Sequence, residues 1–205
     1  MTPVTGTPVC TGAVHLGALS MAIERLEPEV GRLRSWAAVL ADVLMAGGRL
    51  LAVGNGGSAA QAQHLTSELV GRYRDDRAPM SAIALHAETS ALTAIANDYP
   101  PEELYTRQVR AHGRPGDVLV ALSTSGRSPN ILAAVTAGRD AGLTTLALTG
   151  RPHNPLFELV DDAVAVDTPY TATVQEVHQV VVHLLCASVD LAIGASVALK
   201  EVSNR

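Results

Sequence analysis

The chain has 205 residues, 47% of them hydrophobic, and a formal net charge of −5 at neutral pH. This length suits one α/β domain with a well-buried core and is too short for two domains of ordinary size. The sequence contains no block of basic residues, so DNA and RNA have little electrostatic reason to bind. We therefore expect no nucleic acid partner.

Lysine and cysteine usage narrows the function classes further. Of the 15 basic residues only Lys200 is a lysine, and it lies close to the C-terminus. A buried Schiff-base lysine is therefore not expected, which argues against class I aldolase, transaldolase and pyridoxal phosphate chemistry. No Gly-Lys-Ser/Thr phosphate loop is present either. The N-terminus lacks the features of a secretion signal, and Cys10 and Cys186 form no disulfide framework, so we expect a cytoplasmic protein.

Residues 1–15 are rich in threonine, proline and glycine and predict a flexible tail. Residues 16–205 predict a single domain that includes an N-terminal helical arm. From about Leu19 to Met45, apolar residues recur at steps of three and four, which predicts one long amphipathic helix. Its apolar face needs a partner, either the body of the domain or a matching helix of another subunit.

The central part of the chain alternates between apolar strands and helices. Strands are expected at Arg49–Val53, Ser81–Leu85, Asp117–Leu122, Leu143–Leu148 and Ala163–Val166. Helices are expected at Ser58–Tyr73, Ala87–Ala96, Glu102–His112, Pro129–Ala141 and Pro155–Leu159. Continuous apolar strands between helices predict an α/β fold with a parallel five-stranded sheet covered by helices on both faces.

The segment from Leu50 to Arg74 carries the most chemical information. An apolar strand leads into the run GNGGS at residues 54–58 and then into a helix. Glycines let the backbone approach a ligand closely, Ser58 is a suitable N-cap, and a helix N-terminus favours a phosphate or another anion. The spacing formally fits a dinucleotide fingerprint as well, but the acidic residue expected at the end of the second strand is missing.

Farther along this helix, His64 and Glu68 stand four residues apart, so their side chains share one face. An imidazole and a carboxylate one turn apart suit a divalent metal or acid/base chemistry. Taken alone, this spacing is more often that of a surface pair.

The loop STSGRS, residues 123–128, follows the third strand and supplies four hydroxyls and a glycine at a helix N-terminus. Ligands of parallel sheets bind beyond the carboxyl ends of the strands, where this loop falls. Hydroxyls and helix N–H groups can hold a phosphate without lysine, although a Ser/Thr cluster in this position can also serve only as a cap.

The last helix, from about Ala172 to Ala198, is apolar and long enough to suggest a membrane span. His183 and Asp190 within it would be costly in lipid, so we expect no membrane contact. Burial in a subunit interface fits better. We expect this helix and the N-terminal one to form a bundle between subunits.

Several motifs together resemble the phosphoheptose isomerases, the branch of the sugar isomerase (SIS) family that interconverts sedoheptulose 7-phosphate and a heptose 7-phosphate. They are GNGGSA, QHLTSEL and GRYR within residues 54–74, ANDY at 96–99, STSGRS at 123–128, ALTG at 147–150 and QEVH at 175–178. The resemblance covers roughly Leu50 to Ala195. It implies the SIS, flavodoxin-like fold and a homotetramer with active sites shared between subunits.

The resemblance also implies a reaction and the residues that carry it. Glu68 is the base and His183 its partner in an aldose–ketose isomerisation that passes through an enediol and yields D-glycero-D-manno-heptose 7-phosphate for heptose biosynthesis. One Zn²⁺ per subunit is implied, with the ligands His64, Glu68, Gln175 and His183. Substrate contacts are implied for Asn55, Gly56, Gly57, Ser58, Glu68, Arg72, Asn97, Asp98, Ser123, Thr124, Ser125, Ser128 and Gln175, with the serine loop on the phosphate.

Helix geometry bears on this ligand set. Gln175 and His183 are eight residues apart, which is about 12 Å along a continuous helix and about 80° around it. Their side chains would barely converge on one ion. Either the helix starts after Gln175, or the ligands come from more than one chain.

Two departures from the family pattern concern the substrate. Ala172 and Thr173 stand where the family commonly has charged residues, and the loop at 151–155 lacks the glycines common there, so the exact sugar and the pathway served stay open. The main rival is a non-catalytic SIS scaffold resembling the DnaA initiator-associating protein. That branch lacks the carboxylate and histidine matching Glu68 and His183, which favours the enzyme. A third interpretation is a sugar-phosphate-binding regulator, usually fused to a DNA-binding segment.

Overall fold

The computed structural model describes residues 11–203 and the side chains of residues 11–194. Within these residues, five strands form one sheet in the order β2-β1-β3-β4-β5, and every pairing is parallel. The strands are β1 Leu50–Gly54, β2 Ala82–Ala84, β3 Val118–Ser123, β4 Thr144–Thr149 and β5 Asp162–Ala165. The predicted parallel five-stranded sheet is therefore confirmed, with strand ends that differ from the prediction by one residue.

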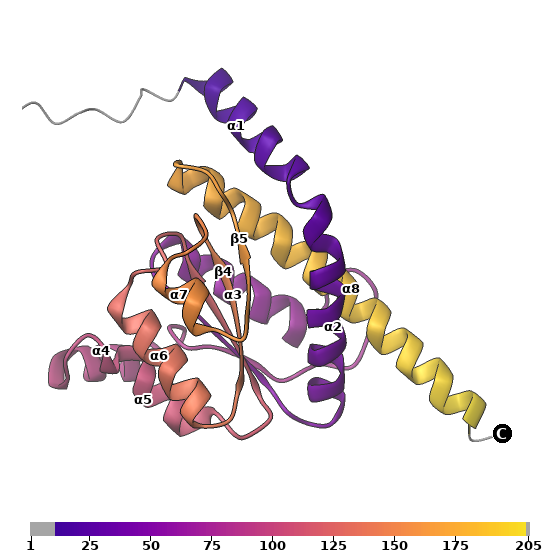
Figure 1. The fold of residues 1–205 in the computed structure, drawn as a ribbon. Helices are drawn as coiled ribbons and strands as arrows, with labels where there is room; N and C mark the ends of the chain where they lie inside the picture. The colour runs from indigo at the N-terminus through magenta and orange to yellow at the C-terminus, as the bar shows by residue number, and fades with distance from the viewer. Residues whose placement is uncertain (1–10, 204–205) are drawn as a thin grey trace, which may run out of the picture.

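Helices cover both faces of the sheet (Figure 1), as predicted. Because successive strand residues point to opposite faces, Leu50 and Ala52 of β1 join one apolar core and Leu51 and Val53 join the other. The first core is closed by α1 Gly12–Glu24, α2 Val30–Met45, α3 Gly57–Val70 and α8 Thr171–Ser203. The second is closed by α4 Thr89–Asp98, α5 Glu103–His112, α6 Pro129–Asp140 and α7 Pro155–Leu159.

The N-terminal arm is two helices, so the prediction of one helix from Leu19 to Met45 is wrong. A 3₁₀ turn, η1 Glu27–Glu29, separates α1 from α2. Pro28 lies in this turn, has no N–H to donate and clashes with the preceding helical turn. Residues 12–15, expected in the tail, belong to α1, whereas residues 1–10, including Cys10, lie outside the described residues.

The apolar stripe predicted in the arm is confirmed in α2, which packs it against its own domain. Leu33, Trp36 and Leu40 are buried in the same core as residues of α8. The indole N–H of Trp36 donates to Asp162 Oδ2 at 2.7 Å and so ties α2 to β5. Of the two partners considered for this face, α2 uses the body of the domain.

Helix α8 crosses the whole domain along the face that carries α2 and α3 (Figure 1). Its residues Val177, Val181 and Leu185 are buried, and so is Cys186, as predicted. Among the described residues, Thr171–Gly194 is one segment long and apolar enough to cross a membrane, and 39% of it is buried inside the protein. Core helices of globular domains meet the same criteria of length and composition.

Candidate active site

The loop between β1 and α3 brings the backbone of α3 close to the sheet. Gly56 has a φ of +55° and is the N-cap, so α3 begins at Gly57 and the predicted cap, Ser58, is instead a buried residue of the first turn. At Gly54 an added Cβ would lie 2.5 Å from the carbonyl carbon of Ser58. Glycine is therefore required at position 54 by the close approach of strand and helix.

His64 and Glu68 of α3 meet His183 of α8 within one chain. The Nε2 atom of His64 lies 3.1 Å from Glu68 Oε1 and 3.0 Å from Nε2 of His183. One potential ligand atom from each side chain lies within 4.8 Å of the others. The predicted shared face of His64 and Glu68 is confirmed, and His183 faces it from a helix more than a hundred residues away in sequence.

These three side chains fit a metal ion. Two imidazole nitrogens and a carboxylate oxygen form a donor set that suits Zn²⁺. The second carboxylate oxygen of Glu68, Oε2, is buried and has no hydrogen-bond partner within the described part of the protein. A buried, unpartnered carboxylate oxygen is costly unless a cation or a ligand proton approaches it.

Cys186 lies in α8 near the same side chains and is buried. Its burial first, and then the carboxylates of Glu68 and Asp190, raise the pKa of Cys186 to about 12. Within the described residues, the donor atoms that lie close together are those of His64, Glu68 and His183, and the Cys186 sulfur is not among them. The candidate donors are therefore the imidazoles and the carboxylate.

The serine loop lines a separate cavity of about 350 Å³ at the carboxyl ends of β3 and β4. Its lining includes Thr124, Ser125, Arg127, Arg151 and Asn154. Thr124 and Ser125 of the predicted phosphate loop thus line a cavity. The guanidinium groups of Arg127 and Arg151, which the prediction did not include, line it as well. Arginines provide charge-assisted hydrogen bonds to phosphate oxygens, so this cavity suits an anion.

The other predicted residues of this loop serve its own structure. Ser123 is buried, and its hydroxyl accepts a hydrogen bond from Gly126 N–H at 3.1 Å. Gly126 has a φ of +61° and packs directly against the side chain of Asn154, which leaves no room for a Cβ. Ser128 is the N-cap of α6 but makes no side-chain capping hydrogen bond.

A buried polar network connects this loop to α8. The His178 ring is fully buried, and its Nε2 lies 3.1 Å from the carbonyl oxygen of Thr149. The Thr149 hydroxyl donates to the carbonyl of Ser123 at 2.9 Å and accepts from Asn154 Nδ2 at 3.1 Å. Hydrogen bonds thus link His178 of α8 to the loop that lines the anion cavity, although His178 is not part of the lining.

Comparison with known proteins identifies the family. A family model described as SIS domain matches residues 16–150. The phosphoheptose isomerase of Streptomyces coelicolor (strain ATCC BAA-471 / A3(2) / M145) is 59% identical over 179 residues, which cover 87% of this chain and 78% of that protein. The chain belongs to the phosphoheptose isomerase family of SIS domain proteins.

Solved structures of phosphoheptose isomerases share the fold. The phosphoheptose isomerase from Neisseria gonorrhoeae is 39% identical, with a TM-score of 0.77, over 87% of this chain and 94% of that one. The one from Francisella tularensis is 33% identical, with a TM-score of 0.79 and the same coverage. The predicted family, isomerase class and SIS fold are thereby confirmed.

The Gln175 side chain lies at the start of α3 in this member of the phosphoheptose isomerase family. Helix α8 begins at Thr171, so the idea that it starts after Gln175 is wrong. A Cβ added to Gly57 would lie 2.6 Å from Gln175 Nε2, which places this amide beside the first turn of α3. Gln175 thus lies about two helical turns before His183, next to the predicted substrate residue Gly57.

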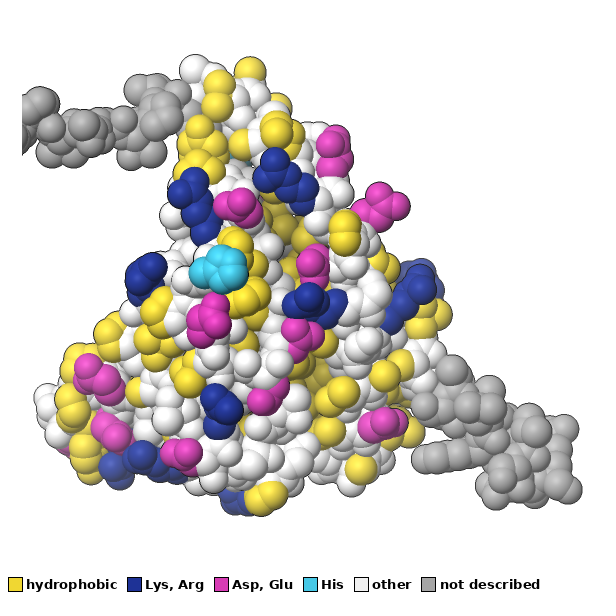
Figure 2. Space-filling view, in the orientation of Figure 1, with side chains coloured by type: hydrophobic (Ala, Val, Ile, Leu, Met, Phe, Trp, Pro, Cys, Tyr) yellow, Lys and Arg dark blue, Asp and Glu magenta, His cyan; other side chains and the backbone are white. Residues whose placement is uncertain are grey.

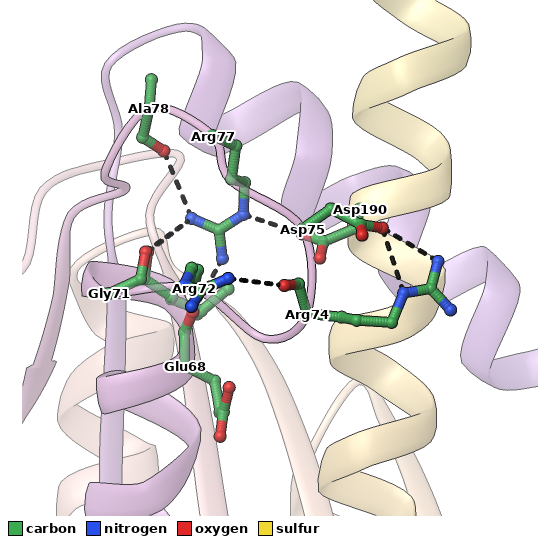
Figure 3. Close-up of polar contacts among 9 residues, drawn as sticks. Glu68, Gly71, Arg72, Arg74, Asp75, Arg77, Ala78 and Asp190 are labelled. Atoms are coloured by element: carbon green, nitrogen blue, oxygen red, sulfur yellow. Dashed lines mark hydrogen bonds and ion pairs between the residues drawn. The ribbon is translucent and has the colours of Figure 1, made fainter.

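Other predicted substrate residues are spread over the molecule. Asn97 and Asp98 lie at the exposed end of α4, on the face of the sheet opposite to α3 and α8. Asn55 exchanges hydrogen bonds of 2.9 and 3.0 Å with Asn130 at the start of α6. Arg72 lies in the exposed turn after α3, where it donates to the carbonyl of Arg74 (Figure 3).

Two neighbours of His183 were not predicted from the sequence. Nε2 of Gln179 lies 3.3 Å from Nε2 of His183, and the ring centroid of Tyr73 lies 5.8 Å from that of the histidine. The spacing of four residues between Gln179 and His183 was a usable signal, because it puts both on one face of a helix. The approach of Tyr73 had no such signal, because it depends on the turn after α3.

Proposed function

We propose that the protein is an aldose–ketose isomerase that converts sedoheptulose 7-phosphate into D-glycero-D-manno-heptose 7-phosphate in heptose biosynthesis. The observation that carries the proposal is the Glu68 carboxylate. One of its oxygens is held by His64, and the other is buried beside His183 with no hydrogen-bond partner among the described residues. A carboxylate held in this way has an oxygen free to take a proton from a substrate carbon.

The proposed reaction moves one hydrogen between neighbouring carbons. Glu68 removes a proton from C1 of the ketose, which leaves an enediol, and returns a proton to C2. Meanwhile the C2 carbonyl oxygen gains a proton and the C1 hydroxyl loses one, so that C1 becomes the aldehyde. When no metal occupies the group, His183 is placed to carry this proton between the two oxygens, because its Nε2 faces the group that holds Glu68. With a metal bound there, the same nitrogen would be a ligand, and the metal would polarise the carbonyl instead.

We propose Zn²⁺ as the resident metal, held by His64, Glu68 and His183. These three side chains would hold the ion, and when bound it would supply Lewis-acid polarisation of the substrate carbonyl. The amide of Gln175 lies beside Gly57, and this neighbour supports contact with the substrate as the role that we propose for it.

The phosphate of the substrate is assigned to the cavity of the serine loop. Thr124 and Ser125 offer hydroxyl donors there, and Arg127 and Arg151 offer positive charge. Binding of the phosphate in this cavity would fix one end of an extended sugar while its C1 and C2 atoms lie near Glu68.

We also propose a homotetramer with active sites shared between subunits. The projecting helix α1 exposes apolar side chains (Figure 2), among them Leu16 at 67% and Met21 at 56% of their surface. Asp98, a predicted substrate contact, ends a helix that packs on the face of the sheet opposite to the one that carries Glu68. A neighbouring chain would cover the exposed apolar side chains of α1 and supply its own Asp98 to the site.

Incubation of the purified protein with sedoheptulose 7-phosphate in D₂O tests the proposed activity. We expect NMR spectra to show a new aldose phosphate with deuterium at C2, because a proton held by Glu68 exchanges with solvent. Glu68→Gln keeps the shape but removes the base, and loss of a general base typically costs about 10²- to 10⁴-fold in rate. A protein that binds the sugar phosphate but leaves it unchanged would instead be a non-catalytic scaffold.

A further inference from the structure

Arg77, in the turn after α3, donates hydrogen bonds to groups of both α3 and α8 (Figure 3). Its Nε donates to Asp190 Oδ1 of α8 at 2.8 Å. One terminal nitrogen donates to the carbonyl of Glu68 at 2.7 Å, and the other to the carbonyl of Leu69 at 2.9 Å. Only 13% of the Arg77 side chain and 21% of the Asp190 side chain are exposed.

The carbonyls bound by Arg77 belong to the last turn of α3, which ends at Val70. Carbonyls in the last turn of a helix have no partner within the helix, and a positive charge there is favourable. The guanidinium supplies both a charge and correctly spaced donors. The backbone of Glu68, one of the residues of the candidate site, is therefore held at its carbonyl by a side chain outside the helix.

The other end of the contact lies on the helix that carries His183. Asp190 follows His183 by seven residues, which is close to two full helical turns, so both side chains project from the same face of α8. That face packs against α3. Arg77 thus joins the turn of α3 that bears Glu68 to the face of α8 that bears His183.

We propose that Arg77 is a positioning residue that, through Asp190, fixes the distance between the Glu68 carboxylate and the His183 imidazole. Arg77 does not touch the reacting atoms. It acts on the backbone of Glu68 and on the placement of α3 against α8. The inference rests on the proposed function for its catalytic consequence, but the placement of the three candidate ligands depends only on the geometry.

The same turn contains a suitable control. Arg74 and Asp75 form an ion pair of 2.9 Å, but their side chains are 77% and 73% exposed. Exposed pairs contribute little to stability and hold nothing in place. Arg74→Gln removes an arginine that lies three residues from Arg77. Within the described residues, the side chain of Arg74 donates hydrogen bonds to Asp75 and not to α3 carbonyls or to Asp190.

The experiment compares Arg77→Gln, Arg77→Lys and Asp190→Asn with Arg74→Gln. For each full-length variant, kcat and KM for sedoheptulose 7-phosphate are measured, together with the affinity for Zn²⁺ alone by competition with a chromogenic chelator. Thermal unfolding shows which variants are folded. Arg77→Lys keeps the charge and gives a second test if Arg77→Gln does not fold.

We expect Arg77→Gln and Asp190→Asn to lower kcat at least tenfold with KM changed less than threefold, and to weaken Zn²⁺ binding by about 10- to 100-fold, as is typical for residues that orient metal ligands. Arg77→Lys should fall between these variants and the wild type. Arg74→Gln should match the wild type in every measurement.

The outcomes separate this inference from the proposed activity. Folded Arg77 and Asp190 variants with lower thermal stability, but wild-type kcat and zinc affinity, would overturn the positioning role and leave the isomerase intact. A wild-type protein that binds zinc but does not isomerise the sugar, with weaker zinc binding in these variants, would support positioning and refute the isomerase. A wild-type protein that does neither would overturn both.

Discussion

Nε2 of His183 lies 3.0 Å from Nε2 of His64, and both residues belong to one chain. The proposed catalytic residues Glu68 and His183 and the candidate metal ligands are therefore brought together without a second subunit. Asp98, by contrast, lies on the far face of the sheet. If the substrate is bound by residues of two chains, we expect Asp98 to be supplied by the neighbouring subunit.

Subunit mixing tests this division of the site. Glu68→Gln mixed with His183→Ala should recover no activity, because a hybrid places both intact residues in different chains. Glu68→Gln mixed with Asp98→Ala should recover some activity, since one site of the hybrid receives an intact Glu68 and an intact Asp98. The measurement is turnover after demonstrated subunit exchange. A 21.3 kDa monomer with full activity in light scattering would contradict shared sites altogether.

Metal analysis should distinguish the role of His183 from that of Gln175. We expect up to one zinc per wild-type chain and loss of activity on chelation, with recovery when Zn²⁺ is returned. His183→Ala should bind zinc at least tenfold more weakly, because it removes one of three grouped ligands. Gln175→Ala should retain its zinc, because that side chain lies beside Gly57. Full activity in chelated, metal-free protein would mean that the group works by acid/base chemistry alone.

Replacement of Arg127 tests the phosphate cavity. Arg127→Gln should raise KM for the sugar phosphate about tenfold with little change in kcat, because a hydrogen bond to a charged group contributes about 1.5 to 3 kcal/mol. The inhibition constant of inorganic phosphate should rise in parallel. Arg110→Gln is the matched control, since Arg110 is an exposed arginine of α5 that pairs with Glu103. Equal kinetics in the two variants would place the phosphate elsewhere.

Much of the fold could be predicted because buried parallel strands are continuous apolar runs bounded by glycine or polar residues. Residues 118–123 show this, since all six are buried and the predicted strand differs by one residue at each end. The break between α1 and α2 was missed although Pro28 is visible in the sequence. The apolar repeat continues across that turn, so the spacing predicts one helix, although Pro28 has no backbone N–H to donate within it.

The candidate site was predictable where neighbours in sequence determine it. His64 and Glu68 lie on one helical turn, so their contact follows from spacing. The placement of Gln175 beside Gly57 depends on how α8 lies along α3, which no local pattern reports. Arg77 and Asp190 are 113 residues apart, and their contact depends on the turn after α3. These contacts depend on how the helices pack against each other, so no sequence motif predicts them.

The buried imidazole of His178 leads to a prediction about pH and stability. Burial lowers the pKa of His178 to about 4, although its hydrogen bond to the Thr149 carbonyl opposes this. The unfolded chain binds a proton at this ring below about pH 6.5, whereas the native protein does so only below about pH 4. Because the unfolded state is then the one that gains protons, stability falls as pH decreases between these values.

His178→Gln isolates this contribution, because glutamine keeps a donor for the Thr149 carbonyl but does not titrate. Urea unfolding of both proteins at pH 7 and pH 5, at one fixed protein concentration, gives the change in free energy of unfolding with pH. We expect the wild type to lose about 2 kcal/mol more than the variant over this interval, from the difference between a pKa of 6.5 and one of about 4. Thr149 also contacts Ser123 of the serine loop. If the glutamine amide keeps the hydrogen bond to the Thr149 carbonyl, the variant should bind inorganic phosphate as tightly as the wild type. Identical pH dependence in the two proteins would show that the pKa of His178 is the same in the folded and the unfolded chain, which would contradict the effect of burial.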